Sequence, residues 1–277
     1  PNTEWNENTG VFTDNPDPTA AAAVGVTNSG VINYLNEFGL TAPGYKTFDP
    51  VSELYYTAIR YYKNLGNVVS YTNNLNATRI DGFPVFTNWQ DPIKYSCQAN
   101  FIIGVGDTNT HADANLPGST IATDPAREPA MPPEVMADNT VNVRTATNKV
   151  GQLENVGYGN LGDRNPSWCC NRNTYFMSGL AYDSHTKDLR SDFAGKQTIT
   201  TYWLDVLESG DRFNTGGAGW RNQFWLTAKY GGFNNVSKDV AYDPYATSVT
   251  APPLADWDSD GNGDPDNYYL SLIHISE

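Results

Sequence analysis

A short, uninterrupted apolar segment near the middle of the chain constrains the fold more than any other feature. Residues 101–106 are Phe-Ile-Ile-Gly-Val-Gly, and a polar segment begins at Asp107. The run is too short for a buried helix and lacks the alternation of a half-exposed strand. Such a segment is typical of a parallel strand that is buried on both faces of its sheet. The sequence therefore predicts a sheet that helices cover on both faces.

Helical and extended patterns alternate around this strand. Asp49-Pro50 predicts the start of a helix, with Asp49 as its N-cap, and apolar residues then recur at helical spacing as far as Gly66. Helices are also predicted over 29–38, over 173–186 with Asn173 as the cap, and over 223–229 before Gly231-Gly232, and a strand over 197–207. This order predicts an α/β fold with parallel strands and helical crossovers.

The stretch 108–172 is too long for a connection in a compact domain, where loops usually run about 2–6 residues. It is rich in Pro, Gly, Asn and Asp, and Cys169-Cys170 lie near its end. We interpret it as a loop-rich insertion that forms a surface subdomain, tied down by a disulfide.

The chain has three cysteines, Cys97, Cys169 and Cys170. Because two neighbours cannot both reach Cys97, three arrangements remain: one long-range bridge with a free thiol, a vicinal disulfide, or a partner cysteine outside this sequence. A zinc site is the weaker interpretation, since the chain lacks a CxxC spacing and a nearby His pair. In an oxidising compartment we expect Cys97 to pair with one of the other two.

An acidic segment near the C-terminus has the spacing of a calcium loop. Counted from Asp258, oxygen donors stand at positions 1, 3, 5 and 9, Gly263 stands at the sharp-turn position 6, and position 7 can offer its backbone carbonyl. The expected ligands are Asp258, Asp260, Asn262, Asp264 and Asp266. The loop departs from an EF-hand because Tyr269 replaces the bidentate Glu of position 12 and no amphipathic helices flank it. It is closer to extracellular calcium repeats, and the alternative is a flexible acidic turn.

Charge and composition exclude several classes of protein. With 31 Asp and Glu against 17 Lys and Arg, the net charge is −14, so nucleic acid is not an expected partner. No apolar run approaches the roughly 18 residues that cross a bilayer, and no signal peptide precedes Pro1. We expect a fragment or mature product of a longer extracellular protein, with its targeting signal elsewhere.

The sequence has no pattern of catalytic residues. The motifs of serine hydrolases, zinc proteases and nucleotide-binding loops are missing, and Gly104-Val105-Gly106 lacks a third glycine. The three histidines His111, His185 and His274 assemble no acid–base pair by their spacing, and His185 is expected at the surface near a helix end. A glycosidase-like carboxylate pair would leave no spacing signature. We expect no enzyme.

Five motifs in a fixed order resemble the PilC/PilY family of type IV pilus tip-associated adhesins. They are residues 101–111, 142–145, 179–182, 195–198 and 229–233. The acidic loop is similar to that family too, and the resemblance extends from about Gly25 to Tyr269. It implies a von Willebrand factor A-like fold, formed by 1–107 and 173–235, with the insertion 108–172 and a C-terminal extension 236–277 that carries the calcium loop. The family's C-terminal β-propeller is absent, and 271–277 does not resemble the family's continuation.

The same resemblance implies a second metal site, of which this chain has one part. Such domains bind a divalent cation at the carboxyl ends of their strands through an Asp-x-Ser-x-Ser motif, a loop Thr and an Asp. Asp107 matches the last of these, Asp49 stands in place of the Thr, and the Asp-x-Ser-x-Ser motif is missing, so the first strand is expected upstream of Pro1. His111 and Asp113 could add ligands. Alternatively, Asp107 caps its own turn.

The resemblance implies a function in pilus assembly and in adhesion at the pilus tip. It predicts an extracellular location on the bacterial surface, minor pilins as partners, an unidentified surface receptor, and a contribution to attachment and twitching. The alternative is a secreted calcium-dependent carbohydrate-binding or carbohydrate-active module, in which Trp and Tyr side chains would stack on sugars. The scatter of the Trp residues along the chain favours packing over one sugar-binding strip.

Overall fold

The computed structural model describes residues 3–6, 8–25, 27–37, 48–76, 80, 83–106, 110–126, 128–155, 159–164, 173–207, 221–234 and 250–271. The chain forms two compact units. The first consists of Pro1–Thr47 and Val69–Trp89, and the second of Phe48–Val68 and Gln90–Glu277. None of the described helices is both long and apolar enough to span a membrane.

The first unit is built from short helices, α1 (Pro18–Val24), α2 (Val31–Glu37) and α4 (Val69–Thr72). Asp17 caps α1 by accepting the backbone N–H of Ala20 at 2.9 Å. The ring of Tyr34 on α2 meets Phe83 edge-on, with centroids 5.2 Å apart. The helix predicted over 29–38 is thus confirmed as α2, two residues later at its start.

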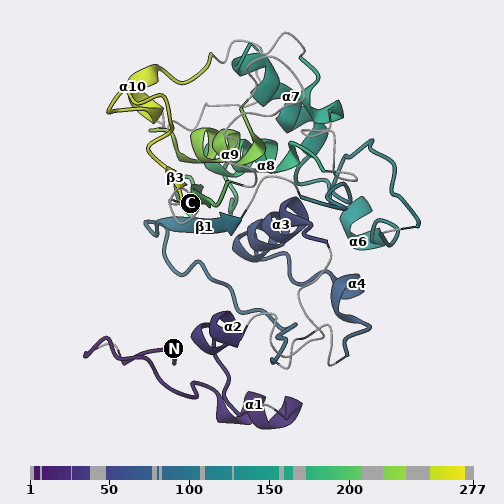
Figure 1. Cartoon of the computed structure of the whole chain (residues 1–277), viewed down its shortest axis with the longest axis vertical. Helices are drawn as coiled ribbons and strands as arrows, with labels where there is room; N and C mark the ends of the chain where they lie inside the picture. Colours follow the sequence, from purple (N-terminus) through teal and green to yellow (C-terminus); the bar gives the residue numbers. More distant parts are fainter. Residues whose placement is uncertain are drawn as a thin grey trace, which may run out of the picture. The chain divides into compact units, whose positions relative to one another are not determined.

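The second unit contains a parallel three-stranded sheet, as the sequence predicted. Its strands are β1 (Asn100–Gly106), β2 (Ile199–Asp205) and β3 (Tyr268–Leu270), in the order β1-β2-β3 (Figure 1). The pairing of β1 with β2 runs from Asn100↔Ile199 to Gly106↔Asp205. Because the strands are parallel, their carboxyl ends meet at one edge of the sheet.

The four longest described helices of the second unit form the layer next to this sheet: α3 (Val51–Tyr62), α7 (Val143–Leu153), α8 (Phe176–Thr186) and α9 (Gln223–Gly232). Figure 1 shows α8 and α9 side by side next to the sheet, and both helices pack against β2. All eleven residues of α8 are buried, because α3, α7 and α9 contact it as well. The helix predicted over 173–186 is confirmed as α8, which begins three residues later.

The prediction that β1 is buried on both faces is wrong. Phe101, Ile103 and Val105 are 49%, 75% and 63% exposed, although their neighbours in the strand are more buried. β1 lies at an edge of the sheet, and the described helices cover only the face of Gly104, where the ring of Trp203 fills the place of a side chain. An apolar run identifies a strand, but it does not reveal which segment covers each face.

Several predicted helix ends also differ from the structure. α3 begins at Val51 with Pro50 as its N-cap, whereas Asp49 was the predicted N-cap and Pro50 the predicted first residue. Asp113 accepts the backbone N–H of Ser52 at 2.6 Å and takes the place of a local cap. α8 begins at Phe176, so Asn173 is not its N-cap. α9 continues through both glycines that were expected to end it.

His185 is buried rather than exposed at the surface. Its ring nitrogens lie 2.9 Å from the carbonyl oxygen of Ile199 and 2.7 Å from that of Phe233. The side chain therefore joins α8 to the start of β2 and to the end of α9.

The described part of 108–172 contains more regular structure than a loop-rich insertion suggests. It holds α6 (Pro133–Met136), α7 and the 3-10 helix η1 (Leu161–Asp163). α7 packs against α8, and its buried residues include Val143, Ala146 and Val150. Asn142 caps α7 by accepting the N–H of Thr145 at 2.9 Å. At least this helix is part of the core, whereas the domain boundaries predicted from the sequence stay a prediction.

Candidate functional site

The acidic segment 258–266 forms a loop between a short helix, α10 (Leu254–Trp257), and β3. Asp258 is only 4% exposed, and its carboxylate accepts the backbone N–H groups of Asn262 and Gly263, each at 3.0 Å. Gly263 has a φ of 87°, and the loop also turns at Gly261 with a φ of 72°. These left-handed conformations favour glycine, which explains both glycines of the segment.

The other side chains of the loop also provide oxygen atoms. Asp260 accepts the backbone N–H of Asn262 at 3.1 Å, and Asp266 accepts that of Ser259 at 3.0 Å. Oxygen-only donors suit a hard cation such as calcium, so the residue types fit the ion that the sequence predicted. Within the described ranges, no three acidic, His or Cys side chains gather into a metal-holding group. Calcium binding therefore requires these side chains to turn toward Asp258.

The carboxylate of Asp264 faces α9. It accepts the indole N–H of Trp225 at 3.1 Å, while the backbone N–H of Asp264 donates to the Asn262 side chain at 2.7 Å. This arrangement agrees with a role in which Asp264 offers its backbone carbonyl rather than its side chain, as position 7 of such loops does.

Three side chains, which we call the α9 stripe, contact the loop or the Trp257 that precedes it. Trp225 and Lys229 lie on one face of α9, and Arg221 directly precedes its N-cap residue Asn222. The guanidinium of Arg221 lies 4.7 Å from the ring centroid of Trp225, and its Nη2 donates to the carbonyl of Gly263 at 3.4 Å. The ammonium of Lys229 lies 4.0 Å from the ring centroid of Trp257, directly before the loop. Trp225 and Trp257 meet edge-on with centroids 5.5 Å apart.

Lys229 is itself fixed from the other side. Its Nζ forms an ion pair with Glu154, directly after α7, and the hydroxyl of Tyr230 donates to the same carboxylate at 2.7 Å. Cation–π contacts and buried ion pairs of this kind hold aromatic rings in one position. The α9 stripe was not predicted, although the spacing of four residues between Trp225 and Lys229 in a predicted helix was visible in the sequence.

Asp205, at the carboxyl end of β2, is a further polar residue that the sequence reasoning missed. It is completely buried and accepts the Tyr268 hydroxyl at 2.5 Å and the Asn222 side chain at 2.9 Å. Burial raises the pKa of Asp205 above its usual range. Its position directly after the apolar strand residues was the available signal. Asp107, the predicted metal ligand at the end of β1, lies outside the described residues.

A second group of carboxylates surrounds the start of α3. Asp113 accepts the hydroxyl of Ser52 at 2.6 Å, and burial raises the pKa of Asp113 to about 7. Burial and the nearby charge of Asp113 raise the pKa of Glu53 to about 8. His111 Nδ1 lies 2.7 Å from the carboxylate of Asp49. The two residues that were considered as extra ligands, His111 and Asp113, are thus engaged with the N-terminal region of α3.

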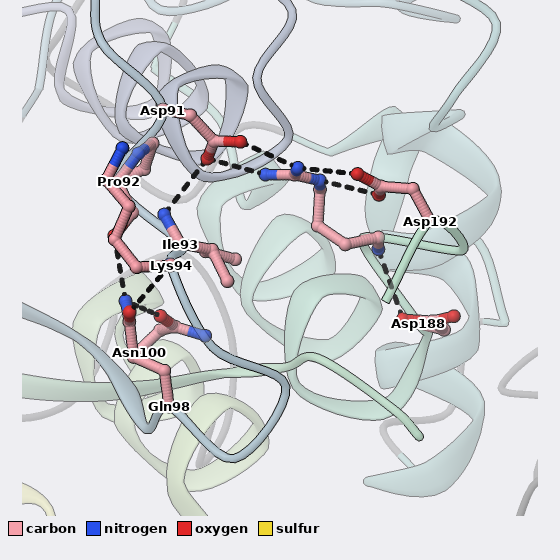
Figure 2. Close-up of polar contacts among 9 residues, drawn as sticks. Asp91, Pro92, Ile93, Lys94, Gln98, Asn100, Asp188 and Asp192 are labelled. Atoms are coloured by element: carbon pink, nitrogen blue, oxygen red, sulfur yellow. Dashed lines mark hydrogen bonds and ion pairs between the residues drawn. The ribbon is translucent and has the colours of Figure 1, made fainter. Parts of the chain in front are cut away.

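Cys97 is exposed in a turn before β1, and it has no disulfide partner among the described residues. The structure anchors this region through the buried Arg190, whose guanidinium binds both Asp91 and Asp192 (Figure 2). Both contacts of Arg190 with Asp91 measure 2.8 Å. Cys169 and Cys170 lie outside the described residues, so the predicted bridge stays a prediction.

Two comparisons with known proteins agree with each other. The family model described as "PilY1 homolog, second domain" matches residues 48–174. The protein named "Type IV pilus biogenesis factor PilY1 homolog" of Xylella fastidiosa is 42% identical over 304 aligned positions, which cover 98% of this chain and 24% of that protein. The chain therefore spans about a quarter of the length of this relative. No solved structure matches the chain.

Proposed function

Since the chain belongs to the PilY1 family, we propose that it is part of a protein that acts in the biogenesis of type IV pili. The observation that carries this proposal is the identity of 42% to a pilus biogenesis factor, which extends over 98% of the chain. Four of the five motifs that pointed to the family overlap β1, α7, α8 or α9, and the motif 195–198 directly precedes β2.

The proposal places the protein at the pilus tip on the outside of the bacterial cell. There it contacts minor pilins and supports attachment to a surface and twitching motility. The parallel sheet suits this function because it fixes the loops at the ends of its strands, so that contacts there need little ordering when a ligand binds.

The fold proposed for this region is von Willebrand factor A-like, and further strands complete the sheet beside β1. The position of β1 at an edge of the described sheet supports this proposal, because its backbone can pair with a further strand. The exposed side chains of Phe101, Ile103 and Val105 agree with a second helical layer on that face, because a parallel sheet is normally covered on both faces. In this arrangement Asp107 belongs to a metal-dependent adhesion site that is completed by an Asp-x-Ser-x-Ser motif upstream of Pro1. Asp107→Ala would then spare pilus assembly and weaken attachment.

Calcium in the acidic loop is the proposed stabiliser of the C-terminal extension. The supporting observations are the oxygen-only donor set, the buried Asp258, and the left-handed turn at Gly263. A bound calcium ion would neutralise the carboxylates of Asp258, Asp260 and Asp266. Such an ion would fix the segment that leads into β3.

The experiment that tests this function is the phenotype of a strain that lacks the parent gene. We expect weaker attachment and less twitching, and a plasmid copy of the wild-type gene should restore both. Normal attachment and twitching in the deletion strain would contradict the proposal. The alternative, a carbohydrate module, has less support because Trp203 and Trp225 are buried and so offer no platform for a sugar ring. Glycan-array binding would revive that alternative.

A further inference from the structure

The contact between the acidic loop and α9 suggests how the loop is held in position before calcium binds. Trp225 and Lys229 are four residues apart and therefore lie on one side of α9, and Arg221 directly precedes the N-cap residue Asn222. Between them they contact the residue before the loop, Trp257, and two residues within it, Gly263 and Asp264.

We propose that Trp225 is a positioning residue of the calcium loop, because its indole N–H holds the carboxylate of Asp264 against α9. This inference rests on the calcium site proposed above. It assigns Asp264 a part that differs from that of the other acidic residues, since its side chain anchors the loop to the core rather than binding the ion.

The hydrogen-bond pattern supports this division. The carboxylate of Asp258 bonds the backbone of the loop itself, as do those of Asp260 and Asp266. The carboxylate of Asp264 instead points away from the loop and accepts a hydrogen bond from the indole N–H of Trp225 at 3.1 Å. A loop anchored at this point loses less conformational entropy when an ion binds, and less loss of entropy means a higher affinity.

The surroundings of Trp225 keep its indole in place. Trp225 is 2% exposed, and water therefore competes little for its N–H. The guanidinium of Arg221 lies 4.7 Å from the ring centroid of Trp225, and the ammonium of Lys229 lies 5.2 Å from the same centroid. Since Glu154 binds Lys229 in turn, the anchor of the loop extends to the end of α7.

Calorimetric titration of the protein with calcium chloride tests the inference. Trp225→Phe keeps an aromatic ring for the contacts with Trp257, Arg221 and Lys229 but removes the N–H. We expect this variant to bind calcium about tenfold more weakly than the wild type, because it loses a hydrogen bond to a charged group. Trp203→Phe is the matched control, since the indole N–H of Trp203 has no partner in the part of the chain that the structure describes. Its calcium affinity should equal that of the wild type.

A second variant guards against misfolding of the first. Asp264→Ala removes the acceptor instead of the donor, and the double variant Trp225→Phe/Asp264→Ala should bind calcium no more weakly than either single variant. Equal calcium affinities for wild type and Trp225→Phe would overturn the inference and leave the calcium site standing. Additive losses would overturn it too, since Asp264 would then bind the ion directly. If the wild type itself binds no calcium, the proposed site and the inference fail together.

Discussion

Arg190 illustrates how one side chain can join two segments that are far apart in the sequence. Asp91 precedes β1 and Asp192 precedes β2, and the guanidinium of Arg190 bonds both carboxylates, with Nη2 2.7 Å from Asp192. The bonds to Asp192 and Asp91 raise the pKa of Arg190 above its usual range. Because Arg190 is buried, this group ties together the segments that lead into the two strands.

We expect Arg190→Lys to destabilise the protein by about 1–3 kcal/mol, since an ammonium cannot form two bidentate contacts at once. Denaturation with urea measures the change. Arg144→Lys is the matched control, because Arg144 makes a similar contact with Asp163 at the exposed surface, where ion pairs contribute little. Equal unfolding free energies for the two variants would contradict the prediction.

The carboxylates near α3 give a pH dependence of the opposite sign to that of ordinary ion pairs. Burial raises the pKa of Glu53 to about 8, above the ordinary value of 4.5. The folded protein therefore retains a proton that the unfolded chain releases, and the unfolding free energy falls as the pH rises between these two values. Asp113, with a pKa raised to about 7, acts in the same direction.

Glu53→Gln should remove part of the fall in unfolding free energy that occurs as the pH rises. We expect the variant to be roughly 2 kcal/mol more stable relative to wild type at pH 8 than at pH 5, because its amide stays neutral at both values. Urea titrations of both proteins at the two pH values measure this difference. A difference that does not change with pH would show that Glu53 is charged in the folded protein throughout the range.

At the scale of elements, the local sequence predicted whether a segment is a helix or a strand. It predicted less well which other segments pack against each face. β2 and α8 follow from their own apolar residues, and both were predicted within three residues of their ends. The open face of β1 was not predictable, because the same apolar sequence is compatible with a strand that is covered on both faces and with one that is covered on one face. α7 was missed because its 11 residues carry few large apolar side chains.

Long-range contacts account for the remaining differences. The residue that caps the start of α3 is Asp113, which is 61 positions from Ser52 in the sequence, so local cap rules selected Asp49 instead. The loop pattern predicted oxygen donors at alternate positions, and it could not show that Trp225 binds Asp264 from α9. The spacing of the acidic residues thus yields a prediction of calcium ligands, whereas the contacts between the loop and α9 cannot be predicted from it.

The acidic loop yields the prediction that belongs to this scale. Millimolar calcium should raise the melting temperature of the wild-type protein, because an ion that binds only the folded state stabilises it. Asp260→Ala should lose this response, since it removes one carboxylate from the donor set. We expect a dissociation constant of roughly 10⁻⁴–10⁻³ M or somewhat lower. A melting temperature that calcium leaves unchanged in the wild type would contradict the proposal.

For the whole molecule, covalent structure is the first open prediction. We expect a disulfide between Cys97 and Cys169 or Cys170, which would close a loop of about 70 residues and stabilise the fold by on the order of 4 kcal/mol. Mass spectrometry of unreduced peptides identifies the pairing. Three free thiols in protein freshly purified from the cell exterior would contradict it.

The central claim concerns the function of the parent protein in pilus biogenesis, and the amount of pilin at the cell surface tests it most directly. Pili sheared from equal numbers of wild-type cells and of cells lacking the parent gene are compared by immunoblot against the major pilin. The account predicts a strong loss of surface pilin in the deletion strain, with the pilin retained inside the cells and restored to the surface by the wild-type gene. Surface pilin at the wild-type level in the deletion strain would contradict it.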